Sequence, residues 1–230
     1  MTMDALVMAG GRGTRLQPLT FSLPKPLLPV GERPIVEILV RQLAAQEFSR
    51  VFVSVGHKGH LIKTYFAGAA EPDTEVVFLE EQEALGTAGA LQLLPGDVQD
   101  VFVVNGDILT DVDFASVLQG HRGAGFAATV VVHRHPVPLP YGVITLDQDV
   151  VVEVREKPTI ELPVATGMYA MSVRALDAFP PGRVEMPDLL NTLAARRQVR
   201  AHFMDGFWTD VADLAAYEAV NLDAQRWADL

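Results

Sequence analysis

A glycine-rich segment near the N-terminus carries residue types that bind phosphate. The segment reads GGRGTRLQPLT from Gly10 to Thr20, and Lys25 follows it within a PKP sequence. Glycines let backbone N–H groups approach phosphate oxygens, because no Cβ stands in the way. Arg12, Arg15 and Lys25 can neutralise a triphosphate and stabilise charge during phosphoryl transfer. For the loop alone, the alternative is a glycine-rich turn with solvated basic side chains.

Two better-known phosphate loops do not fit this segment. The P-loop pattern G-x-x-x-x-G-K-[ST] is absent. A dinucleotide fingerprint requires a third glycine where Leu16 stands. Arginines are also unexpected where a dinucleotide pyrophosphate lies on bare helix-terminal amides. The segment therefore argues against a dehydrogenase.

Length and composition predict an ordinary globular protein. With 230 residues, 49% of them apolar, the chain can form one large domain with a sizeable core. The absence of cysteine excludes disulfides and thiolate-bound metals, but leaves room for a hard cation held by carboxylates. No run approaches the roughly 18 apolar residues of a membrane helix, and no secretory signal is visible. We expect a cytoplasmic protein that does not bind membranes.

The distribution of charge predicts a small anionic ligand. A net charge of −11 argues against nucleic-acid binding, which needs clustered basic residues. Residues 1–33 differ from the rest, since four basic residues stand there against two acidic ones: Arg12, Arg15, Lys25 and Arg33 against Asp4 and Glu32. A local basic patch on an acidic protein suits a compact anion.

The first half of the chain alternates strand and helix patterns. The predicted strands are short and rich in β-branched residues: Ala5–Ala9, Val51–Val55, Val76–Leu79 and Val101–Val104. The predicted helices between and after them are Pro34–Phe48, His60–Phe66, Thr87–Leu93 and Asp113–Gln119. This rhythm predicts an α/β fold with a mostly parallel sheet flanked by helices.

The second half is richer in strands. We expect strands at Gly125–His133, Gly142–Leu146, Val150–Arg155, Thr166–Ser172, Arg200–Met204 and Phe207–Val211. Helices are expected at Pro187–Arg196 and from about Asp213. Neither a repeat nor a linker divides the chain. We therefore predict a single domain over residues 1–230, with halves of about 1–112 and 113–230 and a β-rich extension over the mouth of the core.

Four polar or glycine-rich segments follow predicted strands. They are Gly10–Thr14, Gly56, Glu80–Gly86 and Asn105–Asp107. Ligands of open α/β sheets bind outside the carboxyl ends of the strands. We therefore expect these segments to converge on one cleft.

The order of the motifs resembles the sugar-1-phosphate nucleotidyltransferases. The loop and PKPLLPVGERPI are followed by EALGTAGAL (Glu83–Leu91), NGDIL (Asn105–Leu109), YGVI (Tyr141–Ile144), REKP (Arg155–Pro158), ATGMYAM (Ala165–Met171) and FWTDV (Phe207–Val211). The resemblance spans nearly the whole chain in the family's order. It implies a Rossmann-like sheet with a β-rich sugar-binding extension.

The resemblance implies two sets of substrate-binding residues. Those expected to bind the nucleoside triphosphate are Ala9, Gly10, Gly11, Gly13, Thr14, Arg15, Lys25, Glu81, Gly86, Thr87 and Gly106. Those expected on the sugar 1-phosphate side are Tyr141, Gly142, Glu156, Lys157, Thr166 and Gly167. Of the 18 basic residues only four are lysines, and Lys25 and Lys157 both precede proline. A flexible point charge suits a phosphate that must be held and released.

The resemblance also implies that Asp107 and Asp210 bind Mg²⁺, and that Arg15, Lys25 and Asp107 are catalytic. Two carboxylates together with phosphate oxygens are a suitable ligand set for Mg²⁺. Taken singly, Asp107 can equally be a turn or capping residue, and Asp210 a surface acid. The sugar 1-phosphate carries its own nucleophilic oxygen, so attack on the α-phosphorus needs no covalent enzyme intermediate.

Base and sugar are harder to predict. The block Ala84–Leu91 looks more like guanylyltransferases than thymidylyltransferases, so GTP is favoured, with UTP, dTTP and CTP left open. A mannose- or heptose-like sugar is favoured, by similarity to short members that lack a C-terminal β-helix. One departure from the family pattern is Ala212-Asp213, where Gly-Thr is usual, which leaves the metal geometry open.

Three further interpretations accompany this assignment. A non-catalytic protein that binds nucleotide sugars as a regulator is the alternative class, although Arg15, Lys25 and both aspartates are present. His57 and His60 have H-x-x-H spacing, but surface histidines are favoured over zinc ligands. A homo-oligomer is compatible with the apolar helix Pro34–Phe48, which can pack in the core or at an interface.

Overall fold

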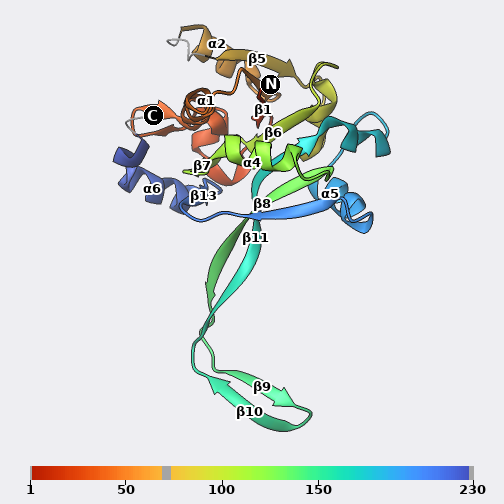
Figure 1. Cartoon of the computed structure of the whole chain (residues 1–230). Helices are drawn as coiled ribbons and strands as arrows, with labels where there is room; N and C mark the ends of the chain where they lie inside the picture. The colour runs from red at the N-terminus through yellow and green to blue at the C-terminus, as the bar shows by residue number, and fades with distance from the viewer. Residues whose placement is uncertain (1, 69–73, 228–230) are drawn as a thin grey trace.

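Seven strands form the central sheet of the computed structural model, which describes residues 2–68 and 74–227 (Figure 1). In spatial order they are β12 (Val199–Phe203), β8 (Ala128–Pro138), β11 (Thr159–Ser172), β6 (Asp100–Asn105), β1 (Asp4–Met8), β4 (Arg50–Val55) and β5 (Glu75–Glu80). Strand β11 runs antiparallel to both neighbours, and every other pair is parallel. The predicted mostly parallel α/β sheet is confirmed.

The sheet is covered by helices on both faces because its central strands are apolar on both sides. In β1, Ala5 and Val7 pack in one core, whereas Leu6 between them packs in the other. The same alternation separates Phe102 from Val103 in β6. Strands buried on both faces need this continuous apolar sequence. The pattern seen in the sequence therefore predicted the position of these strands to within a residue or two.

The helices divide between the two cores. Residues of α1 (Ile35–Ala45), α2 (Gly59–Gly68), α4 (Phe114–Arg122) and α6 (Leu214–Leu222) belong to the first core. Those of α3 (Gly86–Gly89) and α5 (Met186–Ala195) belong to the second. The helix expected at Thr87–Leu93 is a single α-turn followed by a 3-10 turn over Ala90–Leu93. Glycines at both ends of the α-turn and the nearby Pro95 leave little helix propensity there.

Two short ribbons complete the core. Strand β7 (Ile108–Thr110) pairs antiparallel with β13 (Trp208–Asp210), and β2 (Pro29–Val30) pairs with β3 (Arg33–Pro34). The first ribbon joins the segment after β6 to the C-terminal part of the chain. No helix within the described residues has the length and apolar character needed to cross a membrane.

Strands β8 and β11 continue beyond the sheet as an arm, which we define as residues 133–164. Its stem pairs His133–Pro138 with Thr159–Val164, and its tip is the hairpin of β9 (Val143–Asp147) and β10 (Val150–Arg155). Figure 1 shows the arm projecting away from the core. The expectation that this β-rich part lies over the mouth of the core is therefore wrong for this structure, because the stem strands pair with each other and extend past their neighbours.

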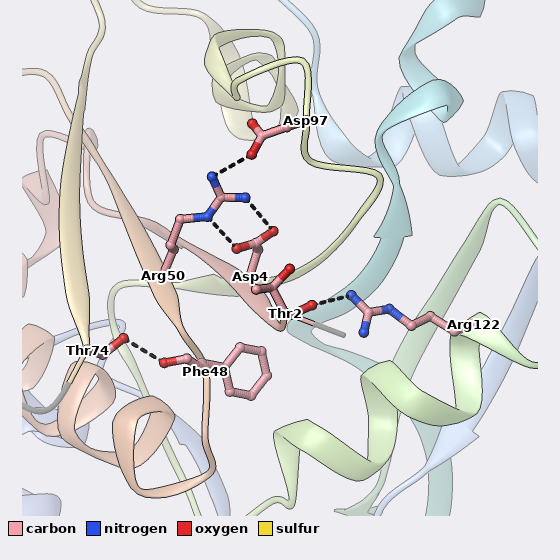
Figure 2. A network of polar contacts seen from close by, with 7 residues as sticks. All are labelled: Thr2, Asp4, Phe48, Arg50, Thr74, Asp97 and Arg122. Atoms are coloured by element: carbon pink, nitrogen blue, oxygen red, sulfur yellow. Dashed lines mark hydrogen bonds and ion pairs between the residues drawn. The ribbon is translucent and has the colours of Figure 1, made fainter.

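An ion-pair network closes the opposite edge of the sheet, where the strands begin. Arg50 donates Nε to Asp4 Oδ1 at 2.8 Å and Nη2 to Asp4 Oδ2 at 2.9 Å, and its Nη1 reaches Asp97 Oδ2 at 2.8 Å (Figure 2). Hydrogen bonding to Asp4 raises the pKa of Arg50 above its usual value. The side chain of Asp4 is only 5% exposed, so its carboxylate depends on this partner.

Replacing Arg50 should destabilise the fold because it leaves the buried Asp4 carboxylate unpaired. We expect Arg50→Ala to lower the free energy of unfolding by roughly 3 kcal/mol. In Arg122→Ala the loss should stay under about 1 kcal/mol, because its partners are the backbone oxygen of Thr2 and, at 3.7 Å, the Asp100 carboxylate, which is 27% exposed and stays hydrated. Urea denaturation of both variants measures the difference. Equal losses would show that the Asp4 pair contributes no more than a surface contact.

Candidate active site

A pocket of about 550 Å³ opens at the carboxyl ends of β1, β4 and β6. Its walls come from several separate parts of the chain: Met8–Gly11, Gly13–Arg15, Lys25 and Pro26, Ser54, Glu81, Ala84, Gly86 and Thr87, Asn105 and Asp107, Arg183 and Glu185, and Ala212. Three of the four segments expected to converge do so. The fourth, Gly56, packs against Gly10 instead of lining the pocket, with its Cβ position 3.1 Å from the Gly10 oxygen.

The floor of the pocket is built from closely packed strand ends. Gly106 donates its N–H to the Met8 oxygen at 2.9 Å, and Ala9 donates to the Ser54 oxygen at 3.1 Å. A Cβ on Gly106 would lie 2.8 Å from the same Met8 oxygen, so only glycine fits without a backbone shift. Gly106 thus supports the floor from below and does not itself line the pocket.

The glycine-rich loop forms one wall. Gly13 has a φ of +62°, and its Cβ position lies 2.9 Å from the Cβ of Lys25. The Thr20 hydroxyl donates to the Gly13 oxygen at 2.8 Å, which fixes the turn, and Leu16 is fully buried beneath it. This packing consequently places the side chains of Arg15 and Lys25 at the pocket, which the glycines of the loop also line. Arg12 is exposed and does not line the pocket.

Lys25 and Asp107 form an ion pair at the floor of the pocket. The side chains are 13% and 24% exposed, so the pair is largely shielded from water. The second carboxylate oxygen of Asp107, Oδ1, is buried and finds no hydrogen-bond partner among the described residues. A buried acceptor without a partner normally has one in the functional state, such as a cation or an ordered water. The site can therefore hold positive charge at this oxygen.

Asp210 is brought near Asp107 by the pairing of strands β13 and β7. Asp210 pairs with Ile108 in this ladder. The following residue, Val211, donates its N–H to the backbone oxygen of Asp107 at 2.9 Å. The side chain of Asp210 is exposed and outside the pocket lining. Residues 2–68 and 74–227 contain no group of three or more His, Cys, Asp or Glu side chains placed to hold a metal. Any cation here would need oxygen ligands from a substrate as well.

The wall opposite the loop contains residues that the sequence analysis missed. Glu185 Oε2 accepts from the N–H of Thr87 at 3.1 Å and from its hydroxyl at 3.0 Å, while Arg183 Nη2 donates to Oε1 at 2.7 Å. These bonds, from Arg183 first and then from Thr87, hold the pKa of Glu185 below its usual range. Arg183 and Glu185 immediately precede α5, and a charged pair before a helix was the only signal of their role.

The pocket contains all but one of the residues predicted for nucleotide binding. Only Gly106 falls outside the lining, and Asp107 is inside it. Glu81 lies against the loop, since a Cβ on Gly10 would be 2.6 Å from Glu81 Oε1. Glu81 Oε2 also accepts from the Leu85 N–H at 3.3 Å. The residues predicted to bind the nucleotide thus line one pocket. That a nucleotide binds there stays a prediction.

The residues predicted for the sugar-phosphate side are not brought together. Thr166 and Gly167 lie where β11 bulges; the Thr166 hydroxyl donates to the Val131 oxygen at 2.9 Å, and the Gly167 Cβ position is 2.6 Å from Asn105 Nδ2. The other four, Tyr141, Gly142, Glu156 and Lys157, stand between the stem and tip strands of the arm, and none of them lines the pocket. The structure therefore separates them from the loop.

Residues 4–226 match the nucleotidyl transferase family, and the chain belongs to that family. The chain is 31% identical to a mannose-1-phosphate guanyltransferase of Candida albicans over 91% of its own length and 61% of the relative's. It is 30% identical to a UTP–glucose-1-phosphate uridylyltransferase of Synechocystis, covering 79% of the chain and 52% of the relative. The chain thus spans between about half and three fifths of the length of these relatives.

Two solved structures share the fold. A protein of Bacillus anthracis, named as a candidate glucose-1-phosphate thymidylyltransferase and crystallised with sucrose, aligns with a TM-score of 0.79 at 24% identity, covering 97% of this chain and 96% of the other. HddC of Yersinia pseudotuberculosis, complexed with GMP-PN, aligns with a TM-score of 0.72 at 20% identity, covering 96% and 99%. At these identities the likeness supports the fold alone.

The packing at Gly106 gives a test of the floor of the pocket. Gly106→Ala should lower the free energy of unfolding by roughly 1–3 kcal/mol, because the new Cβ meets a backbone oxygen that cannot move freely. Gly120→Ala is the control: it lies in α4 with open space around its Cβ position and should gain up to about 1 kcal/mol from helix propensity. Denaturation midpoints distinguish the two. A neutral Gly106→Ala would mean that the strand ends can separate without cost.

Proposed function

We propose that the protein transfers a nucleoside monophosphate from a nucleoside triphosphate to a sugar 1-phosphate and releases pyrophosphate. The observation that carries the proposal is the meeting of the glycine-rich loop with Lys25 and Asp107 in one pocket. A loop of free backbone N–H groups beside a cation and a carboxylate is suited to a bound triphosphate. Membership of the family supports the same reaction.

In this proposal the loop binds the triphosphate and the opposite wall binds the nucleoside. Gly10, Gly11 and Gly13 offer backbone donors, and Arg15 neutralises phosphate charge. Gly86 and Thr87 bind the base and ribose, with the Thr87 hydroxyl held by Glu185. The chain provides these groups already in place, so little reorganisation is needed when the nucleotide arrives.

The residues present fit a magnesium ion. Asp107 lines a pocket suited to phosphate, its Oδ1 has no hydrogen-bond partner among the described residues, and Asp210 follows on the paired strand. Carboxylate oxygens together with phosphate oxygens are the ligands that Mg²⁺ takes in nucleotide sites. We propose that Asp107 and Asp210 hold Mg²⁺, which when bound neutralises phosphate charge and draws electron density from the α-phosphorus.

Lys25 has a distinct part in this mechanism. It pairs with Asp107, and a bound triphosphate would offer it a second anionic partner. We propose that Lys25 then stabilises the charge spread over the phosphate oxygens while the sugar-phosphate oxygen attacks in line. The sugar phosphate oxygen is already ionised, so no residue of the chain needs to remove a proton from it.

The choice of base and sugar rests on the relatives. The guanyltransferase relatives favour GTP with mannose 1-phosphate, and the resemblance of the sequence to short family members adds a heptose-like 1-phosphate. The uridylyltransferase relative at nearly the same identity keeps UTP as the alternative, and thymidylyl or cytidylyl transfer remains in the same reaction class. A non-catalytic regulator that binds nucleotide sugars is the second functional class. Lys25 and Asp107 argue against it, because a binding protein has no need for a shielded charge pair at the phosphates.

Pyrophosphate release tests the reaction and the role of Asp107 together. We expect wild-type protein with Mg²⁺ to release pyrophosphate from one pair in a panel of GTP, UTP, dTTP, CTP and ATP against mannose, heptose, glucose and glucosamine 1-phosphates. Asp107→Asn should lower kcat at least ~100-fold, because the charge that balances the phosphates is lost. Replacing the exposed Asp205 by Asn is the matched control and should leave kcat unchanged.

Folding of Asp107→Asn is checked by circular dichroism before its kinetics are interpreted. Near-normal turnover of a folded Asp107→Asn protein would exclude Asp107 as a metal ligand. Nucleotide-sugar binding by the wild type without pyrophosphate release from any pair would favour the regulator.

A further inference from the structure

The arm carries a group of polar residues that lies outside the pocket. Tyr141 is 75% exposed, and the Gly142 Cβ position lies 3.1 Å from Glu156 Oε2. Lys157 follows with a φ of +43°, a left-handed conformation that a lysine adopts at a cost. We name Tyr141, Gly142, Glu156 and Lys157 the arm cluster. Its members stand on both strands of the ribbon, where the stem meets the tip, and none of them lines the pocket formed by the described residues of the same chain.

The stem holds the arm cluster away from the chain's own pocket. Strand β8 runs in the same direction as β6, because both are antiparallel to β11, so the stem leaves the sheet at the pocket's edge. Seven successive residue pairs, from Val132 with Ala165 to Pro138 with Thr159, keep the stem extended. At about 3.4 Å per residue the stem carries the cluster ~20 Å beyond the sheet. Bending back would break this ladder.

The tip of the arm has one apolar face. The ladder of β9 and β10 places Val151 opposite Leu146 and Val154 opposite Ile144, and a bulge at Val152 keeps these four side chains on the same face. They are 53–62% exposed. The opposite face is mixed: the Thr145 hydroxyl donates to Glu153 at 3.3 Å and Arg155 pairs with Glu153, while Val143 and Val150 stand there opposite Arg155 and Asp147. We name Ile144, Leu146, Val151 and Val154 the tip face.

Such a ribbon is not stable by itself. A two-stranded hairpin is marginal in water and normally packs its apolar face against another layer. The described part of the chain offers nothing over the tip face, since every residue of β10 is exposed. By contrast, the segment between Arg15 and Lys25, two residues that line the pocket, presents apolar side chains to solvent, and we name these the apolar rim: Leu19, Phe21 and Leu23. Two exposed apolar surfaces are thus present in each chain, one on the arm and one beside the pocket.

We propose that the arm of one chain lies across the pocket of a second copy, so that the arm cluster completes the partner's active site. The proposal rests on the function proposed above, in which this cluster serves the sugar 1-phosphate. In the dimer, each nucleotide pocket receives Lys157 and Glu156 from the other chain. The tip face packs on the apolar rim at Leu19–Leu23, and the stem keeps its ladder.

A second copy fits better than another partner because the two surfaces occur on the same chain. A two-fold axis lets each arm reach the other's pocket, so both arms and both rims are covered at once and the contact closes. The exchange also fits the position of the arm cluster, because the two strands of the arm hold its residues near each other without any contact from the pocket. A partner of another kind would cover the tip face but leave the sugar side of the pocket open.

The mass of the protein in solution tests the arm contact. We expect sedimentation equilibrium to give twice the chain mass for the wild type. Ile144→Ser with Leu146→Ser should give the mass of one chain, because it makes the tip face polar. Thr145→Ser with Asp147→Asn, on the opposite face of the same strand, should remain dimeric. A monomeric wild type, or a dimer that tolerates the tip-face changes, would overturn the proposal.

Complementation tests whether the site is shared. Asp107→Asn and Lys157→Ala chains with different tags are coexpressed, and the mixed dimer is isolated by two affinity steps. Each variant alone should be inactive. The mixed dimer should recover about half of the wild-type turnover, since one site then joins an intact core to an intact arm from the other chain. No recovery in the mixed dimer would mean that each arm serves its own pocket.

The two proposals fail in different ways. If the wild type releases no pyrophosphate with any substrate pair, the reaction is wrong, while the mass measurements still decide whether the tip face joins two copies. If the wild type is active but the mixed dimer is not, the reaction stands and the exchange of arms is wrong. Nucleotide binding, measured by calorimetry on Lys157→Ala, should be unchanged, because the nucleotide side belongs to one chain.

Discussion

The pocket depends on how closely the ends of β1, β4 and β6 approach one another. Their parallel registers place Met8 beside both Ser54 and Asn105, so three strands end on one line. The backbone bonds from Gly106 to Met8 and from Ala9 to Ser54 then fix the first residues after each strand. Because these are backbone contacts, the positions of the loop and of Asp107 follow from the sheet itself. A binding floor built in this way is as rigid as the core beneath it.

The pair of Lys25 and Asp107 reconciles an acidic chain with the anionic ligand proposed for it. The net charge of −11 repels a triphosphate at long range, but screening limits that field to about 8–10 Å in physiological salt. Inside the pocket the nearest charges determine binding: Arg15 and Lys25 line it, and the Asp107 carboxylate has one oxygen without a hydrogen-bond partner among the described residues. When phosphate and cation bind together, the phosphate can pair with Lys25 and the cation with Asp107. Neither charged side chain is then left without a partner, so the buried charges stay compensated.

The sequence predicted the sheet and the nucleotide wall because both depend on local patterns. The strands β1, β4 and β6 are continuous apolar runs, and the glycine-rich loop follows the first of them directly. Arg183 and Glu185 were missed because Glu185 bonds to Thr87 from almost a hundred residues away, with Arg183 bonded to Glu185, and the loop that carries both has no sequence pattern of its own. The direction of the arm was also missed: alternating residues predict strands β8 to β11, but not whether the ribbon folds over its own core.

In the proposed function, the arm separates the two substrates. The proposed nucleotide side is built on strand ends that cannot move without disturbing the core, whereas the proposed sugar side stands on a ribbon that is joined to the core through its stem. Changes in the arm cluster therefore leave the loop and Asp107 where they are. Sugar preference can then vary while the chemistry at the α-phosphorus is kept, because discrimination between similar sugars needs only a few altered hydrogen bonds. If the arm acts on a second copy, the exchange of arms becomes part of that sugar site, and its geometry is set by the contact between two chains.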